Sequence, residues 1–205
     1  MTSAPTTRAG SHPDQDAEPS HRARLLNALG VSIEERGYRA TTVSDIVREA
    51  RTSRRTFYQE FGTKEECFIE LLHTANTDMI DDIVAAVDPE APWRTQIRQA
   101  VEAYVRSIEA RPALTLSWIR ELPALGPTAR PVQRQAMEDF IQTLIALTDT
   151  DRMRAAGIST ISRSLALLML GGLRELTAVA VEDGQPVSDT TETMVDAYIA
   201  LLLPR

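Results

Sequence analysis

The chain has 205 residues, of which 43% are hydrophobic and 5% aromatic, so it can bury a core built mainly from aliphatic side chains. A single cysteine, Cys67, excludes an intrachain disulfide and a cysteine-cluster zinc site, and three scattered histidines give no pattern of metal ligands. We therefore expect no metal and no cofactor, and a protein of the reducing cytoplasm.

The net charge of −7 is distributed unevenly along the chain. Residues 20–64 hold nine Lys/Arg and five Asp/Glu, whereas residues 65–205 hold twelve Lys/Arg and twenty-one Asp/Glu. A basic N-terminal unit on an acidic body is typical of a protein that meets phosphates at one end. The first nineteen residues carry no apolar signal segment, and the apolar run 165–173 is too short to span a bilayer, so we expect no membrane partner.

Three short helices are predicted after a disordered tail over residues 1–19. The first begins after Ser20 and stops near Gly37, a residue type that commonly ends helices. The second covers Val43–Ala50, and the third covers about 53–60.

The rest of the chain also has helical periodicity, interrupted by proline and glycine. A loop is expected over 122–131, where three prolines and a glycine gather. No period-two pattern predicts a strand, so the fold class is all-α with about nine helices. The six later helices are expected over about 63–88, 97–111, 112–122, 131–149, 159–182 and 188–202.

The segment 37–68 has the pattern of a helix-turn-helix, whose second helix enters the DNA major groove. Thr42 and Ser53 are placed to cap its two helices. Phe57 and Phe61, four residues apart, share the face that must point to the core. The opposite face carries Arg54, Arg55, Tyr58 and Gln59.

These polar side chains suit recognition of duplex DNA. Arginine bonds guanine bidentately, glutamine bonds adenine, and hydroxyl groups reach phosphates, so Arg54, Arg55 and Gln59 are the candidates for base reading. Lys64, at the start of the fourth helix, is placed to meet a phosphate. The alternative for each arginine is that it only solvates a surface helix, and for Arg39 and Arg48 the two alternatives are evenly balanced.

The segment resembles the DNA-binding domain of the tetracycline-repressor (TetR) family of bacterial regulators over about 45 residues. The resemblance implies a two-domain, all-helical, Ω-shaped homodimer whose C-terminal domains bind small molecules and dimerise through the last two helices. It divides the chain into a DNA-binding domain over 20–66 and an effector-binding and dimerisation domain over 67–205. The matching residues are Gly37, Thr42, Val43, Ile46, Ala50, Ser53, Thr56, Phe57, Tyr58, Phe61, Lys64, Glu65, Glu66 and Phe68.

The sequence departs from the family pattern at the turn after the second helix, where Arg51 replaces the usual glycine and Thr52 the usual hydrophobic residue. A left-handed turn without glycine costs about 1 kcal/mol. Either the turn has another shape or Arg51 adds a phosphate contact, and we favour the contact. The predicted DNA-binding residues are Thr42, Arg51, Ser53, Arg54, Arg55, Thr56, Tyr58, Gln59 and Lys64.

A pair of glycines, Gly171 and Gly172, lies inside the predicted helix 159–182. Each costs a helix about 1 kcal/mol relative to alanine, so a compensating close approach of another helix is expected. That helix comes either from a second copy or from the same chain, and the family resemblance favours the second copy. The predicted dimer interface is Leu165, Leu168, Gly172, Leu176, Val179, Val195, Tyr198, Ile199 and Leu202.

A ligand pocket among the middle helices would be mostly apolar with few polar groups. The candidate walls are Tyr104, Trp118, Met137, Phe140 and Met169, and the candidate polar anchors are Arg120 and Glu121. Residues of these types are more often core or surface residues, and that alternative stays open for each of them.

The sequence therefore predicts a DNA-binding transcriptional regulator, a repressor, that reads a palindromic operator as a homodimer and is released by a small-molecule effector. No catalytic motif is present and the last 132 residues hold no histidine, so we expect no enzyme activity. The alternative is a helical protein-interaction module without a DNA function. That module would explain the apolar helices but not the polar face around Arg54.

Overall fold

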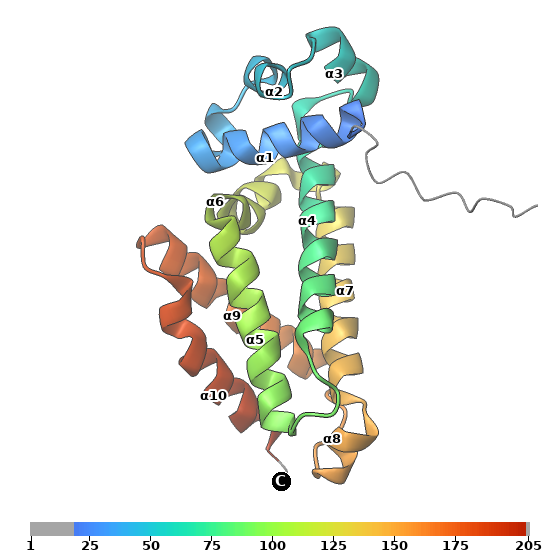
Figure 1. The fold of residues 1–205 in the computed structure, drawn as a ribbon, viewed down its shortest axis with the longest axis vertical. Helices are drawn as coiled ribbons and strands as arrows, with labels where there is room; N and C mark the ends of the chain where they lie inside the picture. The colour runs from blue at the N-terminus through green and yellow to red at the C-terminus, as the bar shows by residue number, and fades with distance from the viewer. Residues whose placement is uncertain (1–18, 204–205) are drawn as a thin grey trace, which may run out of the picture.

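The computed structural model describes residues 19–203 and is all-helical over that range (Figure 1). The predicted tail over 1–19 lies almost wholly outside the described residues. The α-helices are α1 (His21–Ala40), α2 (Val43–Glu49), α3 (Arg54–Glu60), α4 (Lys64–Ala86), α5 (Trp93–Ala110), α6 (Pro112–Leu116), α7 (Arg130–Thr148), α8 (Asp151–Ala155), α9 (Arg163–Glu182) and α10 (Thr191–Leu202).

The three N-terminal helices begin where the sequence places capping residues. Thr42 and Asp45 form a capping box at α2, in which each side chain bonds the backbone N–H of the other. Ser53 accepts a hydrogen bond from the N–H of Thr56 at the start of α3. Gly37 breaks the helical geometry of α1 with φ 76°, as expected of a glycine near a helix end.

The elements between α5 and α9 differ from the prediction. The expected helix 112–122 is α6 followed by a π-helical turn over Ser117–Glu121, and the expected loop continues as a 3₁₀ segment over Leu122–Thr128. The short helix α8 was not predicted, because five residues between two loops leave no detectable periodicity. Another 3₁₀ turn, Val187–Thr190, precedes α10.

The apolar side chains form two cores. The first holds α1–α3 together with the start of α4, through Leu72, and residues of α6 and the following turns such as Leu114 and Leu122. The second lies among α5, α7, α9, α10 and the far half of α4. The helix α4 has 23 residues, about 35 Å, and runs from the first core into the second beside α7 (Figure 1). The domain boundary at residue 66 stays a prediction, and the start of α4 packs with the N-terminal helices.

Candidate nucleic-acid interface and internal cavity

The helix α3 has one buried and one exposed face, as its sequence predicts. Phe57 and Phe61 are buried in the first core, and their rings lie 5.8 Å apart. On the other side Arg54, Arg55 and Gln59 are exposed. Tyr58 is 58% exposed, an unusual position for an aromatic side chain in a small helical unit. At the edge of the molecule away from α5–α10, α2 and α3 are open to a partner (Figure 1).

Several basic residues of the N-terminal unit are paired with carboxylates, whereas the arginines of α3 are not paired with any carboxylate of residues 19–203. Arg22 is paired with Glu70, and Arg39 with Glu121. In contrast, Arg51, Arg54 and Arg55 are exposed and have no carboxylate partner within residues 19–203; the Arg54 guanidinium donates to the Ser44 hydroxyl of α2. The unneutralised positive charge is therefore concentrated at the helix-turn-helix.

Arg51 occupies a left-handed turn. Its φ is 50°, the one positive value among the described non-glycine residues. The turn thus keeps the shape that glycine normally favours, and the expectation of another shape does not hold. The backbone strain is of the order of 1 kcal/mol. The Arg51 side chain is exposed beside α3, where a phosphate contact stays a prediction.

Lys64 has a structural role that the sequence did not reveal. Its Nζ donates to the carbonyl oxygens of Tyr38 at 3.1 Å and Thr41 at 2.8 Å, and it lies 4.1 Å from the centroid of the Tyr38 ring. Burial lowers the pKa of this ammonium group. Lys64 therefore joins α4 to the end of α1, which leaves it one unused donor for the predicted phosphate contact.

The hydroxyl of Thr42 is also engaged within the protein, because it donates to the Asp45 carboxylate at 2.6 Å. Together with the Thr42 backbone N–H and the Arg48 guanidinium, this bond holds the pKa of Asp45 well below its usual range. Ser53 and Thr56 bond each other at 2.9 Å. Thr42 and Ser53 thus cap their helices, and all three side chains stay candidate phosphate contacts.

Two contacts join the N-terminal helices to α6 and the turn after it. The Glu34 carboxylate of α1 accepts hydrogen bonds from the backbone N–H groups of Ala113 and Leu114. Arg39 donates to Glu121 at 2.7 Å, so Glu121 belongs to this joint and not to a pocket. A movement of α6 would therefore be transmitted to α1 through these hydrogen bonds.

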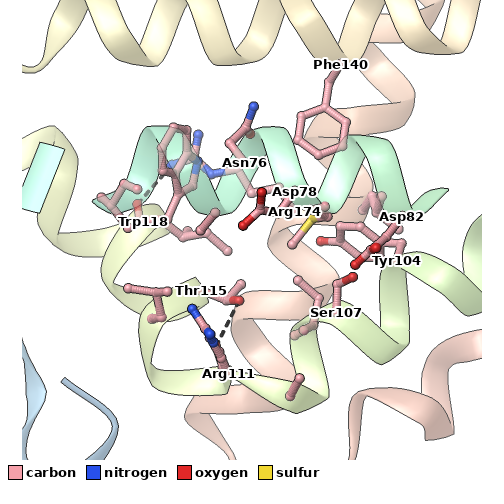
Figure 2. Close-up of a pocket in the computed structure, with 18 of the residues that line it drawn as sticks. Asn76, Asp78, Asp82, Tyr104, Ser107, Arg111, Thr115, Trp118, Phe140 and Arg174 are labelled. Carbon is pink, nitrogen blue, oxygen red and sulfur yellow. Dashed lines mark hydrogen bonds between the residues drawn. The ribbon is translucent and has the colours of Figure 1, made fainter. Parts of the chain in front are cut away.

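A cavity of about 350 Å³ lies between α4, α5, α6, α7 and α9 (Figure 2). This volume is within the range of small-molecule sites. Of the predicted walls, Tyr104, Trp118, Met137 and Phe140 line it. Met169 lines a neighbouring cavity of about 70 Å³. The structure therefore brings four of the five predicted side chains together around one cavity.

The predicted anchor Arg120 is not a wall of this cavity. Its guanidinium bonds Glu175 and Glu182 at 2.7–3.2 Å on the surface of α9, and this pairing raises its pKa. Sequence reasoning missed Asn76 and Arg174, which do line the cavity. The sequence signal that could have identified them is a polar residue on the otherwise apolar inner face of α4 or α9.

One face of α9 is open and apolar. Leu168 is 63% exposed, Val179 is exposed, and a Cβ added to Gly172 would meet no atom within 4 Å. Three further exposed leucines, in α9 and at the end of α10, were not predicted as interface residues: Leu167, Leu201 and Leu203. By contrast Leu165, Leu176, Tyr198 and Ile199 are half-buried against the second core, and Val195 and Leu202 lie inside it. Val195 and Leu202 are therefore core residues of the protomer, because α10 turns its most apolar stripe inward.

Within residues 19–203 no group of three or more His, Cys, Asp or Glu side chains could hold a metal ion. Among the same residues, α9 is long and apolar enough to cross a membrane by length and composition, although core helices pass the same test.

Comparison with known proteins connects the geometry to a family. Residues 25–71 match the model of the bacterial regulatory proteins, tetR family. The chain is 26% identical over 189 residues to the transcriptional regulator EthR of Mycolicibacterium smegmatis, covering 91% of this chain and 85% of EthR. It is 25% identical over 146 residues to the uncharacterised regulator YhgD of Bacillus subtilis, covering 71% and 76% of the two chains.

The fold is shared with solved structures of regulators. The crystal structure of FadR from Bacillus subtilis in complex with stearoyl-CoA aligns with a TM-score of 0.72 at 16% identity, over 87% of this chain and 96% of FadR. The reduced form of NemR from Escherichia coli aligns with a TM-score of 0.72 at 15% identity, over 91% of this chain and all of NemR. At these identities the likeness concerns the fold alone.

Proposed function

Because the chain belongs to the TetR family of bacterial transcriptional regulators, we propose that it is a cytoplasmic repressor that binds a palindromic operator as a homodimer and is released by a small molecule. The observation that carries the proposal is the exposed, unneutralised face of α3, where Arg54, Arg55 and Gln59 stand over a buried aromatic pair.

The DNA contact follows from the chemistry of this face. Arg54, Arg55 and Gln59 have the donor groups that read base edges in the major groove. Tyr58, Ser53 and Thr56 supply hydroxyl groups for phosphates at the rim of the groove. Tyr58 is exposed and does not pack in the core, and this exposure favours a role in contact with a partner.

Homodimerisation would bury the open face of α9. Leu168, Gly172 and Val179 lie on it, and the absence of a side chain at Gly172 leaves room for a helix of the partner. We propose that this face, extended by Leu167 and Leu201, forms the interface with a second copy. The two α3 helices of such a dimer would read successive major grooves 34–36 Å apart.

Release by an effector requires the cavity to be coupled to the spacing of the two α3 helices. Two elements supply the coupling. The helix α4 starts at the DNA-binding unit and contributes Asn76 and Met79 to the cavity wall. The helix α6 contributes Leu114 to the cavity wall and is bonded to Glu34 of α1. An effector that favours another arrangement of these helices would weaken operator binding.

The test is binding of the full chain to duplex DNA over a range of salt concentrations. A DNA-binding protein that neutralises several phosphates loses affinity linearly on a logarithmic scale as salt rises, because counterions are released. Absence of binding even at low salt would contradict the proposal. It would favour the second candidate, a helical interaction module that uses the open face of α9 alone.

The relatives are regulators, and no catalytic role is proposed for this chain. The buried thiol of Cys67, whose pKa burial raises to about 12, does not have the reactivity of a nucleophile.

A further inference from the structure

We propose that the cavity binds an amphiphile with a carboxyl-derived head and a long apolar tail, the head at Asn76 and Arg174 and the tail along α4 toward Val87. This inference names the chemical class of the effector and so rests on the proposed function. It is carried by two polar side chains of the cavity wall, Asn76 and Arg174 (Figure 2), and by the apolar residues that line the space beside them.

Asn76 is the first of these side chains. It is only 9% exposed, it lines the cavity, and its amide makes no hydrogen bond with any described part of the chain. Because this amide faces the cavity without a partner among residues 19–203, a bound polar group can form a hydrogen bond with it. The Asn76 amide offers both a donor and an acceptor to such a group.

Arg174 is the second. It is half-buried on α9, and its one hydrogen bond among the described residues goes to the carbonyl oxygen of Ile119 at 2.9 Å. No carboxylate of residues 19–203 pairs with it, whereas Arg120, in the turn after α6, has two. A half-buried guanidinium with unused donors at a cavity wall is suited to bind a carboxylate or carbonyl oxygen.

The space beyond these residues accepts hydrocarbon. The cavity and its smaller neighbour share Tyr104, Phe140, Leu170 and Leu173 as walls, so the two adjoin each other. From Asn76 to Val87 the two cavities follow α4 for about 16 Å. A chain of many methylene groups is therefore needed to fill them.

The polar side chains of the smaller cavity are already satisfied. The Gln96 amide donates to the carbonyl oxygens of Pro89 and Ala91 at 3.1 and 2.9 Å. The Thr148 hydroxyl donates to Leu144, and the Tyr198 hydroxyl donates to Met169. A ligand in this space thus meets apolar surface and gains by burying methylene groups.

The charges around the cavity favour an anionic or acyl-carbonyl head. A surface depression of about 870 Å³ shares Asn76 and Arg174 with the cavity and is also lined by Arg134, Arg163 and Glu138, an excess of positive charge. Asp78 and Asp82 also line the cavity, but both are exposed, so water screens them more than it screens Arg174. The head group is therefore placed at the half-buried Arg174.

The first experiment measures binding of four probes to the full chain by calorimetry without DNA. Dodecanoate should bind at least tenfold more tightly than butanoate, because of its longer tail, and at least tenfold more tightly than dodecyltrimethylammonium. Dodecanoyl-coenzyme A tests whether the head is a free acid or a thioester. Equal or tighter binding of the cation, equal binding of the short acid, or no binding of either dodecanoyl probe would overturn the proposal.

The second experiment places the head group. Arg174→Met and Asn76→Leu should each weaken binding of the preferred dodecanoyl probe about tenfold or more. Arg106→Met, a change of an exposed arginine on α5 outside the cavity, should leave the affinity unchanged, with thermal melting as the check on folding. Unchanged affinity in both cavity variants would overturn the placement. DNA binding is measured separately. A protein that binds DNA but none of the dodecanoyl probes contradicts only this inference. A protein that binds a dodecanoyl probe but no DNA contradicts only the proposed function.

Discussion

Glu34 of α1 accepts a hydrogen bond from the backbone N–H of Leu114 in α6 at 2.8 Å, and a second from Ala113 at 3.1 Å. A carboxylate at a helix N-terminus is favoured by the orphan N–H groups and by the helix dipole. Because Leu114 also lines the cavity, this bond connects the cavity wall to α1.

Replacement of Glu34 should therefore weaken the coupling between the cavity and the DNA-binding helices more than it lowers the stability of the protein. We expect Glu34→Gln to cost about 0.5–1 kcal/mol of stability, since the contact is partly exposed, and to reduce the effector-induced loss of DNA affinity. The measurement is DNA affinity with and without effector, together with urea unfolding. Glu35→Gln, whose carboxylate bonds only the neighbouring Arg36, is the control. An unchanged effector response in Glu34→Gln would show that α6 is not a route of coupling.

The positive φ of Arg51 predicts opposite effects on stability and on DNA binding. Arg51→Gly should raise the free energy of unfolding by up to about 1 kcal/mol, because the left-handed turn is no longer strained. The same change should lower DNA affinity through loss of a phosphate contact. Arg51→Ala separates the two effects, since it removes the charge and keeps the strain. If both variants bind DNA as the wild type does, Arg51 makes no phosphate contact.

Gly172 tests the open face of α9. A Cβ at this position would meet no atom within 4 Å, and leucine improves helix propensity by somewhat less than about 1 kcal/mol. Gly172→Leu should therefore leave the protomer folded but shift the dimer to monomer, as measured by analytical ultracentrifugation. The control is Arg106→Leu, which adds the same side chain to the exposed face of α5. A Gly172→Leu protein that stays dimeric would place the interface elsewhere.

Cys67 should be inert in the native protein. It is fully buried, and burial raises its thiol pKa to about 12, so the reactive thiolate is scarce at pH 8. Iodoacetamide should label the unfolded chain within minutes and the folded chain only as fast as it opens. Mass spectrometry of native and urea-unfolded samples compares the two rates. Equal rates would mean that the segment around Cys67 is not packed as described.

The sequence alone predicted the N-terminal helices well because their signals are local. Thr42 and Ser53 cap the helices they were expected to cap, and Phe57 and Phe61 point inward as their spacing predicts. A capping box or an amphipathic turn involves residues only three or four apart. The all-α class followed from the same periodicity.

The cavity could be predicted only in part, because its walls come from distant segments. Aromatic residues such as Trp118 and Phe140 were recognised by type, whereas Asn76 became a candidate only from its position in the cavity wall. The structural role of Lys64 was missed for the same reason. Its two carbonyl acceptors lie more than twenty residues earlier in the chain, so its structural role has no local signal.

The measurement that tests the central claim most directly is selection from random duplex DNA. Wild-type protein is compared with a variant that carries Arg54→Ala, Arg55→Ala and Gln59→Ala, at one fixed salt concentration. The matched control carries Arg152→Ala and Arg154→Ala, two exposed arginines of the distant helix α8. We predict that the wild type and the control enrich the same palindromic site and that the α3 variant enriches none. Enrichment of that site by all three proteins, or by none, would contradict the assignment of α3 as the helix that reads the operator.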